Sequence, residues 1–210
     1  MDSIEDYITE HIDSEPTILK QINREAQLKL LHGNMVSGHL QGRVLKMLVN
    51  MIRPQTILEI GTFTGYSALS MAEALGDDAI LHTIEIDDEM EDHIINNLSR
   101  SKLSEKIKLH IGDANDIIPL FEDEFFDLVY LDGNKREYWQ NFEAALLKTK
   151  KSGFIIADNT LWHGKVIEEV KSNDWQTKGI IEFNEKLKSD NRVEKVILPL
   201  RDGLTLIRKK

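Results

Sequence analysis

The sequence predicts an α/β fold in which a mostly parallel sheet is doubly wound, with helices on both of its faces. The first observation is that short apolar strands alternate with helix-like segments, as in parallel βαβ units. The second is that a hairpin signal, Arg201-Asp202-Gly203, lies between the last two strands, which makes one strand antiparallel to the rest. The seven strands are expected at 57–60, 80–86, 107–111, 126–132, 154–158, 193–200 and 204–208, and the helices between the first five at 65–76, 88–100, 114–120 and 136–149.

Residues 1–54 are expected to form extra N-terminal helices that cover one face of the sheet. Apolar residues from Ile4 to Ile12 share one helical face, Pro16 marks a new start, and a third apolar stripe stops at Pro54. The chain shows no repeat, no low-complexity tract and no convincing linker. We therefore expect one domain over residues 1–210, with a helical cap at 1–54 and the sheet-containing core at 55–210.

The composition is that of an ordinary globular protein. Of the 210 residues, 41% are hydrophobic and 30% are charged, and the chain contains no cysteine, which excludes disulfides and thiolate chemistry. Neither a signal peptide nor an apolar run long enough to span a bilayer is present, so a cytoplasmic protein with no membrane partner is expected. The net charge of −10 argues against binding of nucleic acid through an extended basic surface, although a local basic patch could exist.

The stretch from Ile57 to Ser70 is the one around which the core is organised. A short apolar strand is followed by Gly61 and Gly65 and then by an apolar pattern at helical spacing. Strand, glycine turn and helix bring backbone N–H groups up to a ligand, as in a Rossmann-like fold, and Glu85 at the end of the second strand would suit ribose hydroxyls. A nicotinamide-dependent dehydrogenase is a weaker alternative, because its fingerprint is G-x-G-x-x-G.

Acidic residues end all five of the parallel strands. Because ligands bind outside the carboxyl ends of such strands, these residues mark the site. Asp132, Asp158 and Asn159 offer three hard oxygen donors from strands expected to be neighbours, a set that suits Mg²⁺, Mn²⁺ or Ca²⁺. The alternative is that Asp132-Gly133-Asn134 forms a turn and that Asp158 caps a helix. Lys135 follows Asp132 by three, and near a cation it could act as a base.

Four segments together carry a resemblance to a known family. EIGTFTGYSALSMA, GDANDIIP, LDGNKREYW and ADNTLWHGKV resemble, in order and spacing, the cation-dependent class I O-methyltransferases, which include catechol and caffeoyl-CoA O-methyltransferases and bacterial relatives. The likeness runs from about Met35 to the C-terminus. It implies an enzyme that uses S-adenosylmethionine (SAM) as methyl donor.

The resemblance also implies a role for each matching residue. Glu59, Gly61, Thr62 and Ser67 would surround the methionine part of the donor, Glu85 would hold its ribose, and Asp113 and Ala114 its adenine. Met35 and Val36 would close over the donor, and Asp132 would border it. The metal ligands would be Asp132, Asp158 and Asn159, and the catalytic base Lys135.

The acceptor cannot be taken from the resemblance, because Gly133-Asn134 matches neither the catechol nor the caffeoyl-CoA pattern. We expect a small catechol-like aromatic acceptor, with a hydroxyuridine of tRNA as the alternative, since the bacterial branch is also similar to enzymes that methylate that base. A non-catalytic SAM-binding module is a further alternative, against which the intact metal set and Lys135 argue. The amphipathic N-terminal helices could pair, which predicts a homodimer.

Overall fold

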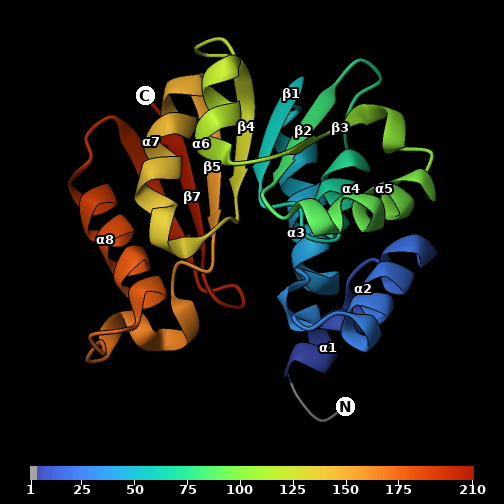
Figure 1. Cartoon of the computed structure of the whole chain (residues 1–210), viewed down its shortest axis with the longest axis horizontal. Helices are drawn as coiled ribbons and strands as arrows, with labels where there is room; N and C mark the ends of the chain where they lie inside the picture. The colour runs from blue at the N-terminus through green and yellow to red at the C-terminus, as the bar shows by residue number, and fades with distance from the viewer. Residues whose placement is uncertain (1–3) are drawn as a thin grey trace.

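The computed structural model describes residues 4–210, and its centre is a seven-stranded sheet (Figure 1). The spatial order of the strands is β3-β2-β1-β4-β5-β7-β6. Only β7 runs against its neighbours, since it pairs antiparallel with both β5 and β6. The strands are β1 (Thr56–Ile60), β2 (Ile80–Glu85), β3 (Ile107–Ile111), β4 (Phe126–Leu131), β5 (Thr149–Asp158), β6 (Val193–Leu198) and β7 (Leu204–Lys209).

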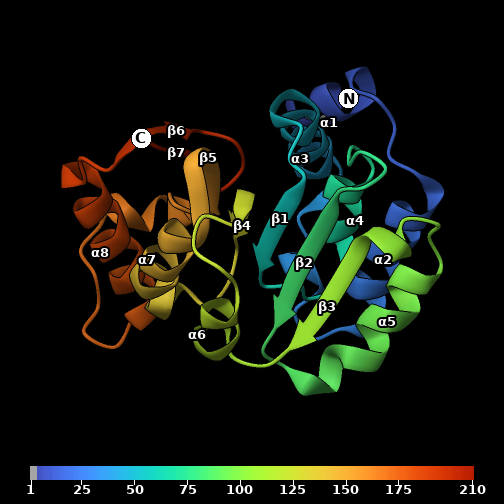
Figure 2. The ribbon, with the colours of Figure 1, turned by 90° about the horizontal axis from the view of Figure 1, so that it is seen from above.

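Helices cover both faces of this sheet, so the doubly wound α/β architecture and the single antiparallel strand are confirmed (Figures 1 and 2). One side carries α2, α3, α4 and α5, and the other carries α6, α7 and α8. The helices are α1 (Ile4–His11), α2 (Thr17–Lys29), α3 (Gly38–Ile52), α4 (Tyr66–Ala72), α5 (Glu91–Ser99), α6 (Ala114–Ile117), α7 (Tyr138–Lys148) and α8 (Trp175–Ser189).

Each face of the sheet has its own hydrophobic core. Alternate residues of β1 point in opposite directions, so Ile57 packs with the N-terminal helices while Leu58 packs with α7 and α8. Leu19 and Ile22 of α2 and Leu45 of α3 are fully buried in the first core. Helices α2 and α3 are therefore an integral layer of the protein. Among the described residues, no helix combines the length and the apolar character that crossing a membrane would need.

The largest differences between the structure and the sequence-based expectations concern α8 and β5; in addition, α4 ends at Ala72 and β6 at Leu198, earlier than expected. Helix α8 was not expected, although Asp174 caps it through Thr177 N–H at 3.1 Å and Ile180, Phe183 and Leu187 lie buried along one side of it. Strand β5 begins at Thr149, five residues earlier than the apolar run indicates, because Thr149 pairs with Phe126 across a register shift. The exposed residues that follow Thr149 hide this extension from an apolar pattern.

Candidate active site

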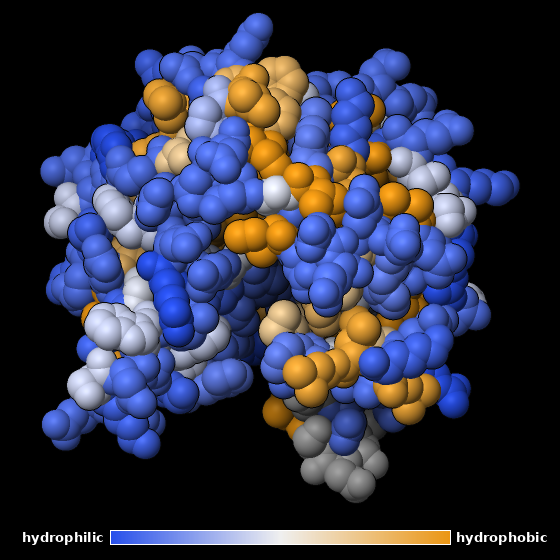
Figure 3. Space-filling view, viewed as in Figure 1, coloured by the Kyte–Doolittle hydropathy of each residue, from blue (hydrophilic) through white to orange (hydrophobic). Residues whose placement is uncertain are grey.

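The expected strand-end residues meet at the carboxyl edge of the sheet. Strand β1 lies between β2 and β4, and Ile60 is in register with both Ile84 and Leu131. Strands β2 and β3 lie on one side of β1, and β4 and β5 lie on the other. The strand order therefore reverses between β1 and β4, and open α/β sheets bind ligands at such a switch point. The space-filling surface is hollowed between the α8 side and the N-terminal helices, below the strand ends as drawn (Figure 3).

The two glycines of the turn after β1 are required by the backbone. Gly61 has φ of +99°, and a Cβ on it would lie 2.6 Å from the carbonyl oxygen of Asp132. Gly65 has φ of +79° and begins α4, where a Cβ would meet Leu98 at 3.1 Å. Because glycine alone accepts such conformations readily, the turn can bring β1 close to the end of β4. Gly61 thus lets the turn lie against Asp132, and Gly65 lets the start of α4 lie against α5.

Glu59 is fully buried beneath the turn. Its carboxylate accepts hydrogen bonds from Ser67 Oγ and Thr83 Oγ1, both at 2.5 Å. Removal from water raises the pKa of Glu59 to about 8, against the lowering effect of the two hydroxyls. Thr62 Oγ1 lies 2.5 Å from Thr83 Oγ1, so Thr62 joins the same network. A buried acid of this kind is suited to a cationic ligand group.

Glu85 and Asp113 each support the loop that follows their strand. Glu85 accepts the backbone N–H of Phe63 at 2.7 Å and that of Asp87 at 3.0 Å. Asp113 caps α6 through the N–H of Asn115 at 2.8 Å, and Ala114 lies buried behind it. Each carboxylate keeps lone pairs beyond those used here, because an ionised carboxylate accepts about four hydrogen bonds.

Met35 and Val36 lie just before α3. Val36 is buried and Met35 is 57% exposed, in a turn that ends where α3 begins. A cavity of about 230 Å³ is lined by Val36, Ser37 and Arg201 among others, so the start of α3 faces the β6–β7 turn. Met35 is the more accessible of the two for a contact with a ligand.

Asp132 and Lys135 form an ion pair directly after β4. Lys135 Nζ donates to Asp132 Oδ1 at 2.8 Å, and Lys135 is 6% exposed. Burial raises the pKa of Asp132, the charge of Lys135 lowers it, and the nearby charge of Asp158 raises it again. Asn134 caps the next turn by accepting the N–H of Arg136, so a turn is present here as well as the carboxylate.

Asp158 ends β5, next to β4, and it caps no helix. Its Oδ2 accepts hydrogen bonds from Gln41 Nε2 at 2.5 Å and from the Tyr130 hydroxyl at 2.9 Å. Its Oδ1 accepts the N–H of Asn159 at 2.8 Å. Asn159 has φ of +56°, a left-handed conformation that asparagine tolerates. Asp158 and Asn159, both expected to bind metal, therefore lie at the end of β5, beside the end of β4 that leads to Asp132.

Several residues that support this cluster escaped the sequence analysis. Tyr138 is fully buried, and its hydroxyl lies 2.6 Å from the carbonyl oxygens of both Leu131 and Asp158, so it joins the ends of β4 and β5. Gln41 reaches Asp158 from α3, and Gly179 lets α8 approach the backbone of Lys135. Tyr138 lies within the segment LDGNKREYW, which the sequence analysis singled out. For Gln41, no local sequence feature distinguishes it from a surface glutamine.

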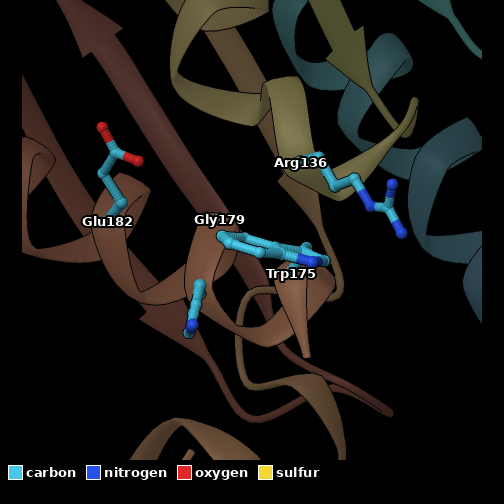
Figure 4. A pocket seen from close by; sticks show the side chains of 5 residues that line it. Arg136, Trp175, Gly179 and Glu182 are labelled. Carbon is cyan, nitrogen blue, oxygen red and sulfur yellow. The ribbon is translucent and has the colours of Figure 1, made fainter. Parts of the chain in front are cut away.

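A shallow pocket of about 500 Å³ lies between Arg136, which follows Lys135, and the first half of α8 (Figure 4). Arg136, Trp175, Lys178, Gly179 and Glu182 line it, and Lys178 Nζ stands 4.4 Å from the centroid of the Trp175 ring. None of the strand-end carboxylates lines this pocket. It flanks the cluster and is separate from it.

The donor atoms of the cluster are of one chemical kind. Among residues 4–210, no group of three or more His, Asp or Glu side chains is arranged to hold a metal ion, and the third oxygen here is the Asn159 amide. Two carboxylates and one amide, without imidazole or thiolate, suit a hard divalent cation. On the donor-atom chemistry, the residues present therefore fit a Mg²⁺-like ion.

Comparison with known proteins identifies the family. Residues 9–210 match the sequence profile of a family described as O-methyltransferase. A caffeoyl-CoA O-methyltransferase of Eucalyptus globulus is 32% identical, over 93% of this chain and 82% of its own length. A catechol O-methyltransferase of Niastella koreensis is also 32% identical, over 79% of this chain and 78% of its own.

Solved structures of methyltransferases share the fold of this chain. The O-methyltransferase TomG of Streptomyces achromogenes, in complex with SAM, superposes with a TM-score of 0.90 at 26% identity, covering 99% of this chain and 96% of its own. The SAH-bound methyltransferase of Podospora anserina gives the same TM-score and identity, covering 99% of this chain and 94% of its own. The chain shares its fold with methyltransferases that bind SAM or SAH, and it matches the family profile over nearly its whole length. The protein therefore belongs to the O-methyltransferase family and is a SAM-dependent O-methyltransferase.

Proposed function

We propose that the enzyme methylates a hydroxyl of a small, catechol-like aromatic acceptor with the help of a divalent cation, Mg²⁺ or else Mn²⁺ or Ca²⁺. The observation that carries the proposal is the cluster of Asp132, Asp158 and Asn159 at the ends of adjacent strands, with buried Lys135 beside it. Two carboxylates drawn together in a buried site repel each other, and a cation between them would remove that repulsion. Among the described residues, the Asn159 side chain has no hydrogen-bond partner, which leaves its oxygen available.

The donor would lie across the ends of β1, β2 and β3. In this proposal Glu59, Gly61, Thr62 and Ser67 surround its methionine part, with Asp132 at its border. Glu85 accepts the ribose hydroxyls, Asp113 and Ala114 border the adenine, and Met35 and Val36 cover it. Supporting this arrangement, Glu59 is a buried acid suited to an ammonium group, and Glu85 can accept further hydrogen bonds.

The chemistry follows from these positions. The acceptor oxygen forms a bond to the methyl carbon as the bond from carbon to the sulfonium sulfur breaks, and neutral S-adenosylhomocysteine (SAH) leaves. Lys135 is the proposed base, and its Nζ takes the hydroxyl proton. A bound divalent cation would stabilise the oxyanion as a Lewis acid. Asp132 keeps Lys135 in place through the 2.8 Å contact, and holding both reactants in line lowers the entropic part of the barrier.

The choice of acceptor rests on two observations. The caffeoyl-CoA and catechol enzymes among the relatives have names that denote aromatics with two adjacent hydroxyls, which could chelate one cation. The net charge of −10 disfavours a polyanionic acceptor such as tRNA, which normally requires clustered lysine and arginine. We expect the acceptor site to be walled by residues 1–34, of which 1–3 lie outside the described residues, and by residues 162–180.

The test is a methyl-transfer assay with labelled SAM and a panel of catechols, acyl-CoA esters and undermodified tRNA. We expect transfer to a catechol that stops in EDTA and returns with Mg²⁺ or Mn²⁺. Asp158→Ala should lose activity by orders of magnitude while SAH still binds, and Asp88→Ala, at an exposed position, serves as the matched control. Undiminished transfer in EDTA would refute the cation, and transfer to tRNA but to no catechol would reverse the choice of acceptor.

A further inference from the structure

Asp158 is held by donors from two other elements. Gln41 on α3 and Tyr130 on β4 both donate to Oδ2, at 2.5 Å and 2.9 Å, while Asn159 N–H donates to Oδ1. All of these side chains are buried, with Gln41 1% exposed and Asp158 4% exposed. Each carboxylate oxygen has two lone pairs, so Oδ2 is saturated and Oδ1 keeps one. A cation that contacts Asp158 would therefore meet Oδ1.

The amide of Gln41 can face Asp158 in only one way. Its Oε1 accepts a hydrogen bond from Arg201 Nη1 at 3.0 Å. A guanidinium has donors and no acceptor, so the amide oxygen must point to Arg201 and the NH₂ group to Asp158. The Tyr130 hydroxyl, 2.8 Å from Gln41 Nε2, accepts a hydrogen bond from that NH₂ group and donates one to Asp158 Oδ2. Arg201 thus determines which end of Gln41 meets the carboxylate.

Arg201 is itself part of a turn fastened to the end of β5. Thr160 N–H donates to Gly203 O at 3.1 Å, and Leu161 N–H donates to Asp202 O at 2.9 Å. A Cβ on Gly203 would lie 2.7 Å from Leu161 N, so the turn and the segment after Asn159 are in close contact. Arg201 also donates to Ser37 O at the start of α3. One turn therefore anchors both the Asn159 segment and the helix that carries Gln41.

We propose that Gln41 is a positioning residue for the cation site, that it presents Asp158 Oδ1 to the ion by occupying Oδ2, and that Arg201 acts through it by fixing the orientation of its amide. The inference rests on the proposed cation dependence. Removing partners that orient metal ligands typically weakens metal binding by 10–100-fold, and Gln41 is placed as such a partner.

The test measures binding of Mn²⁺ alone, by electron paramagnetic resonance of the free ion, to SAH-saturated protein. In Gln41→Met, which keeps the volume and removes the amide, we expect Mn²⁺ affinity to fall by roughly 10–100-fold. SAH affinity and the melting temperature should remain those of a folded enzyme. Gln21→Met is the matched control, because Gln21 also accepts from an arginine, Arg100, but on the outer surface of α2.

A second pair of variants tests the role of Arg201. Arg201→Lys retains a donor toward Gln41 Oε1 and should keep most of the Mn²⁺ affinity, whereas Arg201→Glu offers only acceptors, turns the amide oxygen toward Asp158 and should lose it. Unchanged Mn²⁺ affinity in both Gln41→Met and Arg201→Glu would overturn the inference. If the wild-type protein binds no Mn²⁺, the proposed cation dependence fails instead, so the two failures are distinguishable.

Discussion

Two carboxylates flank the glycine turn, and they differ in what their oxygens contact. Glu59 receives two side-chain hydroxyls and lies fully inside the protein. Glu85 receives two backbone N–H groups of the loop beyond its strand. The charge of Glu59 therefore depends on pH through its raised pKa, whereas Glu85 holds the loop beyond its strand in place.

The residue-scale prediction for Glu85 concerns donor affinity. Glu85→Ala removes the proposed charge-assisted hydrogen bonds to the ribose, so SAM or SAH binding should weaken by about 1.5–3 kcal/mol. Calorimetric titration measures this loss, with Glu89→Ala as a control at an exposed neighbouring position. Unchanged affinity in Glu85→Ala would place the ribose elsewhere.

The prediction for Glu59 concerns pH. Burial raises its pKa to about 8 in the ligand-free protein, so the group is largely neutral at pH 6 and becomes ionised as the pH rises through 8. Only the ionised form attracts the ammonium group of the donor. SAH affinity should therefore increase between pH 6 and 8 and level off above, with a slope of at most about tenfold per pH unit.

Titration calorimetry across this range measures the slope, and Glu59→Gln is the comparison, because it keeps the shape and cannot ionise. A flat profile in the variant and a rising one in the wild type would support the assignment. Equal slopes in both proteins would show that Glu59 does not contact the charged group.

At the scale of elements, α8 shapes the active site through its backbone contact with the Lys135 turn. A Cβ on Gly179 would lie 2.1 Å from Lys135 O, and real atoms do not approach so closely. The position of Lys135 thus depends on an element that follows it by some forty residues of sequence. The donor side, formed by the ends of β1, β2 and β3, lies away from this contact.

Gly179→Ala should therefore separate catalysis from donor binding. Displacement of the Lys135 turn by a fraction of an ångström to one ångström should reduce kcat by about 10–100-fold, while SAH affinity is maintained. Single-turnover kinetics and calorimetry give the two readings. Gly76→Ala is the control, since a Cβ there meets nothing within 4 Å. Full activity in Gly179→Ala would show that the turn relaxes without consequence for the base.

At the scale of the whole molecule, apolar side chains remain exposed on the N-terminal helices and just beyond them. Leu28 is 71% exposed, Leu31 90%, Met47 56% and Met51 72%. A contiguous apolar surface is typical of a protein–protein interface. We expect a homodimer that buries these side chains.

Light scattering coupled to size exclusion should give twice the chain mass of 24.1 kDa. The double variant Met47→Lys/Met51→Lys should shift the protein to a monomer, because burying two unpaired charges in an interface is unfavourable. Val196→Lys/Ile197→Lys, on the exposed edge strand β6, should leave the mass unchanged. A wild-type monomer at micromolar concentration would contradict the dimer.

Local patterns in the sequence, chiefly apolar runs and the residues that end them, predicted much of this fold. The strands β1 to β4 lie within about one residue of their expected bounds, because apolar runs and glycine or acidic ends are visible in a short window. Helix α8 was missed although its cap, Asp174, and its apolar side were present, because the segment before it is rich in charge. The early start of β5 was missed because its first four residues are polar, and Lys151 and Ser152 among them are exposed.

The sequence by itself determined which chemical groups stand at the strand ends: a glycine turn, Glu59, Glu85, Asp113, Asp132, Asp158 and Asn159 follow or end apolar strands, and that arrangement is local. Only the tertiary structure decided what holds them. Gln41 meets Asp158 across 117 residues, and Arg201 meets Gln41 across 160. Such contacts depend on strand order and on the packing of α3 against the sheet, which arise from the sum of many weak burial terms. No single stretch of sequence encodes them, so the donor atoms were predictable and the supports around them were not.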